Sequence, residues 1–251
     1  MNIRSQLTQL ASAACLSLAA MPAAAALYTP SIGALLPGYV QNDDGIFAAV
    51  NLGFSLNFFG TNYSSLFINN NGNATFGAPT RAFNPAPLNI QSTQPMIAPY
   101  WTDLDSTNGG PSAGIYLAQT AHQLIVTWQD LGYFNQNYTG RVTFQLVLND
   151  PSAPIAAGES VIGFFYGRMT SGNDTHTISA GFGDGLSAVN EGEIAYDSGT
   201  SGAASAALDN TSVWFDLIGG APTPTVPEPA SAVLALAGLA LIWGQGRYRR
   251  R

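Results

Sequence analysis

Apolar and polar residues alternate along much of the chain between residues 27 and 218. In AVNLGFSLNFFG, residues 49–60, apolar side chains occupy every second position from Val50 to Phe58, and Asn, Gly and Ser fill the positions between them. Such alternation predicts a strand with one buried face. Three further segments repeat the pattern. The apolar positions are Val50, Leu52, Phe54, Leu56 and Phe58; Leu124, Val126 and Trp128; Val142, Phe144, Leu146 and Leu148; and Val213, Phe215 and Leu217.

Shorter apolar runs between Gly, Asn, Asp, Ser and Pro clusters predict additional strands. No stretch of this region shows a convincing helical period. Many short strands with turn signals between them favour a sandwich or barrel, and we predict an all-β, antiparallel β-sandwich. The additional strands are expected at Leu66–Asn69, Asn73–Phe76, Ala113–Ala118, Val161–Met169, Thr177–Phe182 and Glu193–Tyr196.

The segment LFINNNGNATFG, residues 66–77, contains Asn71-Gly72 between two of these runs. A two-residue type I′ turn needs positive φ at both central positions, which Asn-Gly tolerates best. We therefore predict a β-hairpin turn here. An alternative is that Asn69, Asn70 and Asn73 coordinate calcium through their amide oxygens.

The first 26 residues have the pattern of a secretory signal peptide. Arg4 precedes a short apolar core, and Ala24 and Ala26 provide the small residues that signal peptidase accepts. We predict cleavage after Ala26. The single cysteine, Cys15, lies in the removed segment.

The C-terminus begins with a predicted Pro/Thr linker, residues 219–225, and continues into a charge-free stretch, residues 230–243. As a helix this stretch reaches about 21 Å, short of the roughly 30 Å hydrocarbon core. We expect a short hydrophobic helix that inserts transiently into the membrane. A stop-transfer cluster that stays cytoplasmic follows it, formed by Arg247, Arg249, Arg250 and Arg251.

Pro227-Glu228-Pro229, the apolar stretch and the terminal arginines together resemble a PEP-CTERM sorting segment over residues 226–251. The resemblance implies processing at that tripeptide by exosortase, a membrane protease. It also implies a Gram-negative bacterium that makes exopolysaccharide, and a mature protein at the cell surface or in the matrix. The alternative is an ordinary C-terminal anchor that happens to contain this tripeptide.

Charge narrows the classes of partner. The chain has no lysine. Between the two terminal segments there are fourteen acidic residues and three basic ones, Arg81, Arg141 and Arg168, which gives a formal charge of −11. Phosphate backbones are bound by clustered Lys and Arg, so this composition argues against a nucleic-acid partner. An acidic exported domain is compatible with divalent cations.

YWTDLDSTNGG contains the strongest candidate site. In an extended segment, Asp103 and Asp105 point to the same face, and Asn108 follows nearby. Hard oxygen ligands suit Ca²⁺, so these three residues are the predicted calcium ligands. Two alternatives remain. One aspartate caps a turn while the other is solvated, or the pair serves as the two carboxylates of a glycan hydrolase.

Several separated motifs resemble, in order, the nidogen-like (NIDO) domain over roughly residues 45 to 217, within a domain predicted at 27–218. The resemblance implies an extracellular domain associated with cell–matrix adhesion, and it carries no catalytic residues. The positions are Phe59-Gly60, Asn71-Gly72, Pro99-Tyr100-Trp101, Asp103, Asp105, Trp128, and Phe144-Gln145 with Leu148.

We therefore expect an adhesive or scaffolding protein of the exopolysaccharide matrix that is not an enzyme. Exosortase is the predicted processing partner, and matrix polysaccharide or surface proteins are the predicted ligands. A Ca²⁺-dependent carbohydrate-binding module is the alternative function. The third possible function is a glycan hydrolase that uses Asp103 and Asp105.

Overall fold

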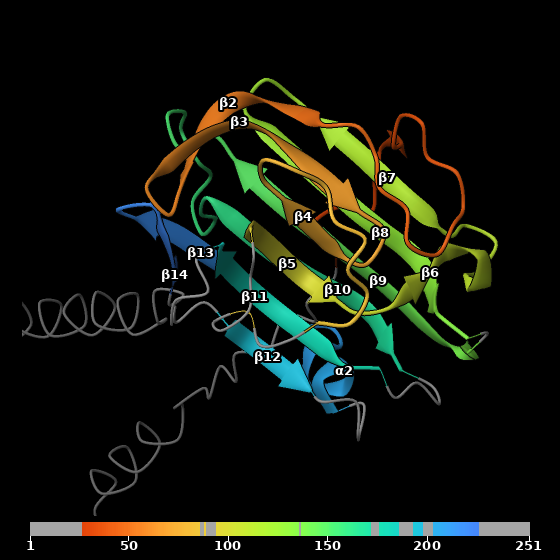
Figure 1. The fold of residues 1–251 in the computed structure, drawn as a ribbon. Helices are drawn as coiled ribbons and strands as arrows, with labels where there is room; N and C mark the ends of the chain where they lie inside the picture. The colour runs from red at the N-terminus through yellow and green to blue at the C-terminus, as the bar shows by residue number, and fades with distance from the viewer. Residues whose placement is uncertain are drawn as a thin grey trace, which may run out of the picture.

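The computed structural model describes residues 27–85, 88, 94–135, 137–171, 176–185, 193–197 and 203–225. These residues form two antiparallel β-sheets packed face to face (Figure 1). The predicted all-β sandwich is confirmed. The predicted signal peptide and sorting segment lie outside the described residues.

The larger sheet has the strand order β1-β7-β8-β9-β10-β13-β14, and β6 pairs with β8 beside β7. Its longest strands, β8 and β9, lie at its centre. The bounds are β1 (Ala34–Leu35), β6 (Leu104–Asp105), β7 (Gly114–Gln119), β8 (Gln123–Tyr133), β9 (Asn137–Asn149), β10 (Ile162–Thr170), β13 (Ser212–Ile218) and β14 (Ala221–Pro224).

The smaller sheet has the order β12-β11-β5-β4-β3-β2. Two short helices complete the described elements, a 3₁₀ turn η2 (Ser106–Asn108) and α2 (Ala203–Leu208). The strand bounds are β2 (Val50–Phe58), β3 (Thr61–Asn69), β4 (Asn73–Thr75), β5 (Pro95–Trp101), β11 (Ile178–Asp184) and β12 (Glu193–Asp197).

Alternating apolar residues of both sheets fill the space between them, as their period predicts. Trp128 of β8 stacks on Phe144 of β9 with ring centroids 5.0 Å apart, and both are fully buried. Phe164 of β10 stacks on Phe182 of β11 at 5.2 Å, which joins the two sheets. Each such buried side chain stabilises the fold by roughly 1.5–3 kcal/mol through removal from water.

The predicted Pro/Thr linker is a strand in part. Residues 221–224 form β14, and its Ala221 and Thr223 alternate with Pro222 and Pro224. Thr225 N donates to the Trp214 carbonyl at 2.9 Å. The odd-numbered residues of this segment are therefore the ones whose backbone nitrogens face β13. Both prolines occupy the positions whose nitrogens face away from β13, so an edge strand tolerates them.

Candidate functional site

The Asn-Gly hairpin is present, with a turn different from the predicted one. Asn69 of β3 pairs with Asn73 of β4, which leaves a three-residue loop. Gly72 has φ +75°, whereas Asn71 does not have positive φ, so the loop is not type I′. A Cβ on Gly72 would lie 1.9 Å from the Tyr100 carbonyl oxygen of β5. Glycine is therefore required both by its φ and by this close approach.

The asparagines of the hairpin are buried rather than exposed. Asn69, Asn70 and Asn73 have no exposed surface, and Asn71 is 2% exposed. Asn69 Nδ2 donates to Asn73 Oδ1 at 2.8 Å, and Asn69 Oδ1 accepts from Thr80 N at 3.1 Å. The side-chain amides of Asn69 and Asn73 are therefore hydrogen-bonded within the protein, as buried polar groups generally are.

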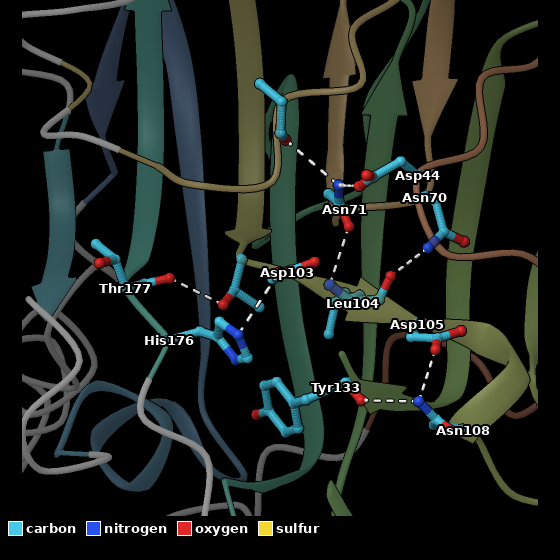
Figure 2. A network of polar contacts seen from close by, with 12 residues as sticks. Asp44, Asn70, Asn71, Asp103, Leu104, Asp105, Asn108, Tyr133, His176 and Thr177 are labelled. Carbon is cyan, nitrogen blue, oxygen red and sulfur yellow. Dashed lines mark hydrogen bonds and ion pairs between the residues drawn. The ribbon is translucent and has the colours of Figure 1, made fainter. Parts of the chain in front are cut away.

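Asn70 and Asn71 fasten two other segments to the hairpin (Figure 2). Asn70 Nδ2 donates to the carbonyls of Asp43 and Leu104. Asn71 Nδ2 donates to Asp44 Oδ1 at 2.8 Å, and Asn71 Oδ1 accepts from Leu104 N at 2.9 Å. The loop before β2 and the segment after β5 are thereby held in fixed positions around the hairpin.

Two of the predicted calcium ligands bind each other. Asp105 Oδ2 accepts from Asn108 Nδ2 at 2.6 Å, while Asp105 Oδ1 accepts from Thr107 N at 2.8 Å. Asn108 Nδ2 also donates to the Tyr133 carbonyl at 3.3 Å. This is the turn-capping arrangement, in which Asp105 caps η2 and both carboxylate oxygens have donors.

Asp103, the third predicted ligand, lies in a different group of side chains. Its side chain is 7% exposed, and one of its oxygens lies within 4.8 Å of carboxylate oxygens of Asp43 and Asp44. His176 Nε2 lies 3.5 Å from Asp103 Oδ2 (Figure 2). The structure therefore gathers Asp43, Asp44 and Asp103, and separates this set from Asp105 and Asn108, which bond each other.

The surroundings of Asp43 alter its titration. Burial, and after it the negative charges of Asp44 and Asp105, raise the pKa of Asp43 to about 6, while His176 opposes the rise. Asp43 Oδ1 is buried with no hydrogen-bond partner among the described residues. Three convergent carboxylates with an unsatisfied oxygen form a hard-oxygen donor set of the kind Ca²⁺ takes.

Asp43 and Asp44 were not predicted as site residues. Their only sequence signal is the dipeptide before Gly45, and nothing in it links them to Asp103. The connection depends on Asn70 and Asn71, which hold the loop containing both aspartates against the hairpin.

The NIDO related family matches residues 20–216. The chain belongs to the NIDO-related family. A second match, the PEP-CTERM protein-sorting motif, covers residues 225–251 and confirms that resemblance as well. This NIDO-related protein is thus exported and sorted toward the cell surface, with exosortase as the processing enzyme.

Two relatives of this NIDO-related protein are the alpha-tectorins of Mus musculus and Homo sapiens. Each is 26% identical over 132 residues, which cover 42% of this chain and 6% of the relative. The chain therefore spans only a small part of the length of these relatives. No solved structure matches it significantly. Within the described ranges, no helix has the length and apolarity needed to cross a membrane.

Proposed function

We propose that this protein is a non-catalytic, adhesive or scaffolding component of the exopolysaccharide matrix of a Gram-negative bacterium. The observation that carries the proposal is the combination of a NIDO-related sandwich with a PEP-CTERM motif directly after it. The sorting motif supplies delivery to the surface, and the sandwich supplies a rigid body that remains there.

The candidate site supports a role without catalysis. Asp105, one of the two carboxylates that a hydrolase would use, caps a helical turn and has donors on both oxygens. Asp103 is 5% exposed and lies against Asp43 and Asp44. A glycosidase needs two carboxyl groups on either side of the scissile bond, one of them free to donate a proton.

The test is the fate of the full chain in an exosortase-bearing host that makes exopolysaccharide. We expect a shortened protein that stays with the washed matrix and releases no reducing ends from it. A double variant, Pro227→Ala with Glu228→Ala, should remain unprocessed in the envelope, and a host without exosortase is the matching control. Processed wild-type protein found wholly in the medium, or sugar release lost in Asp103→Asn, would contradict the proposal.

Calcium-dependent binding is a second candidate function, favoured by the convergence of Asp43, Asp44 and Asp103. Because folding gathers these oxygens, Ca²⁺ would bind the folded state and stabilise it by about 2.7 kcal/mol at a concentration one hundred times its dissociation constant. The measurement is the melting temperature in calcium against chelator. We expect a rise in the wild type and none in Asp103→Asn, while Asp216→Asn, an exposed aspartate on β13, should keep the rise.

A further inference from the structure

A cavity of about 250 Å³ opens where β8 begins and β9 ends. Tyr28, His122, Gln123, Asn149, Asp150 and Glu159 form its polar lining. Pro154, Ile155 and Ala156 form an apolar wall. The cavity therefore combines a polar edge with an apolar surface.

Four of the lining side chains form a closed ring of hydrogen bonds. Gln123 Nε2 donates to Tyr28 OH at 3.0 Å and to Asn149 Oδ1 at 2.8 Å. Tyr28 OH donates to Glu159 Oε1 at 3.0 Å, and Asn149 Nδ2 lies 3.4 Å from Glu159 Oε2. Each member orients the next, so the polar lining is organised before a ligand arrives.

Tyr28 is held at the ring by the outer face of the larger sheet. Its aromatic ring lies 5.2 Å from that of Phe165 and 5.9 Å from that of Trp214. The neighbouring Thr29 forms two hydrogen bonds with Gln145. Thr29 N donates to Gln145 Oε1 at 3.2 Å, and Gln145 Nε2 donates to the Thr29 carbonyl at 3.0 Å. Residues 28 and 29 are thus a fixed part of the cavity.

His122 provides an exposed, oriented group at the edge of the cavity. Its Nδ1 lies 2.8 Å from Asp150 Oδ2, and its side chain is 67% exposed. Asp150 Oδ1 accepts from Ser152 N and Oγ, and the bonds from Ser152, followed by that from His122, lower the pKa of Asp150. The bond through Nδ1 leaves Nε2 of the ring available to a ligand.

We propose that this cavity binds one neutral pyranose unit of a polysaccharide. A pyranose has hydroxyl groups around its edge and an apolar C–H face, which match the ring of polar side chains and the wall at Ile155. The carboxylates of Asp150 and Glu159 disfavour acidic sugars. The volume is below the roughly 300–1,000 Å³ of drug-sized sites, which suits a single sugar ring. The inference rests on the proposed function in taking the matrix as the source of the sugar.

The test is a titration of the secreted full chain, followed by protein NMR, with methyl glucoside, methyl galactoside, methyl mannoside and glucuronate, all in chelator. We expect at least one neutral glycoside to bind with a dissociation constant on the order of millimolar, since small ligands gain little free energy per atom. Glucuronate should bind at least about tenfold more weakly.

Three variants locate the binding. Ala156→Trp fills the cavity from an exposed position without removing a ring member and should abolish binding. His122→Ala should weaken binding about fivefold through loss of one hydrogen bond. Arg168→Gln, an exposed change on β10 outside the cavity, should leave it unchanged.

Binding that persists in Ala156→Trp, a preference for glucuronate, or no shift with any neutral glycoside would overturn the inference. Retention of the processed protein in the washed matrix is a separate measurement. If it persists while the cavity fails these tests, the scaffold proposal stands and the pocket assignment alone is rejected.

Discussion

The hairpin centre and the cavity at His122 are built from the same kinds of side chain and differ in access to water. At the hairpin, Asn69 to Asn71 are buried, and their amides bond backbone groups and side chains of three separate segments. At the cavity, Gln123 and Glu159 bond their neighbours in a ring that borders solvent.

The difference lies in what replaces a lost bond. When a buried amide is removed, its former partners stay unsatisfied in a water-free interior, which costs about 1–3 kcal/mol for each group. Beside an open cavity, water takes the vacated position at little cost. The hairpin amides therefore serve folding, and the cavity side chains are available to a ligand.

Gly72→Ala should have the largest effect. The new Cβ would collide with the Tyr100 carbonyl while the residue keeps φ +75°, so we expect a loss of about 3–5 kcal/mol in the free energy of unfolding. Urea denaturation measures it. Gly77→Ala is the matched control, because Gly77 has φ +83° and nothing within 4 Å of the added Cβ. Gly77→Ala should lose only about 1 kcal/mol in the free energy of unfolding. Equal losses in the two variants would show that positive φ alone, without the collision at Tyr100, causes the loss.

Asn71→Ala is expected next, with a loss of about 1–3 kcal/mol in the free energy of unfolding, because the buried amide loses its bonds to Leu104 N and Asp44 Oδ1 and Leu104 N keeps only the Thr102 carbonyl. Asn62→Ala removes an exposed asparagine whose Oδ1 accepts from Asn57 Nδ2 at 2.9 Å. That control should change the free energy by less than about 0.5 kcal/mol. Similar losses in the two variants would contradict the role assigned to burial.

Asp43→Asn should stabilise the protein, in chelator, in a pH-dependent way. The folded pKa of about 6 lies above the ordinary 3.8, so the folded state binds the proton more tightly, and ionised Asp43 destabilises it as pH rises through 6. After discounting for solvent screening, we expect a gain of about 1 kcal/mol at pH 7.5 that vanishes near pH 4. Melting curves across this range provide the measurement. A gain that is constant with pH would exclude the titration of Asp43 as its cause.

His122→Ala should have the smallest effect on folding. Its side chain is largely exposed and Asp150 keeps its bonds from Ser152, so the free energy of unfolding should change by less than about 0.5 kcal/mol. Urea denaturation measures this change for comparison with Asn71→Ala, and the sugar titration of the same variant measures its loss of binding. A large loss of stability would mean that the cavity edge serves folding after all.

The strands with one buried face could be predicted from the sequence, and β5 could not. Leu52, Leu56 and Phe58 of β2 are fully buried between more exposed neighbours, which is what alternation reports. Six of the seven residues of β5 are buried and the seventh is partly exposed. Without a polar face, such a strand has no period of two to detect.

The candidate site was less accessible to prediction than the fold. Asp103, Asp105 and Asn108 share one short segment, yet Asp103 lies with Asp43 and Asp44 while Asp105 bonds Asn108. Local spacing predicts which side chains share a strand face, and it says nothing of which distant loop packs above them. The burial of the asparagines could not be predicted either, because an Asn-Gly turn has the same sequence at the surface and in a core.

The prolines of β14 have a further consequence where many copies of the protein are concentrated together. An unpaired sheet edge is a template on which another chain can add a strand. Pro222 and Pro224 leave this outer edge without the N–H donors that such an addition would need. Copies crowded at a cell surface can therefore lie against this edge without polymerising through it.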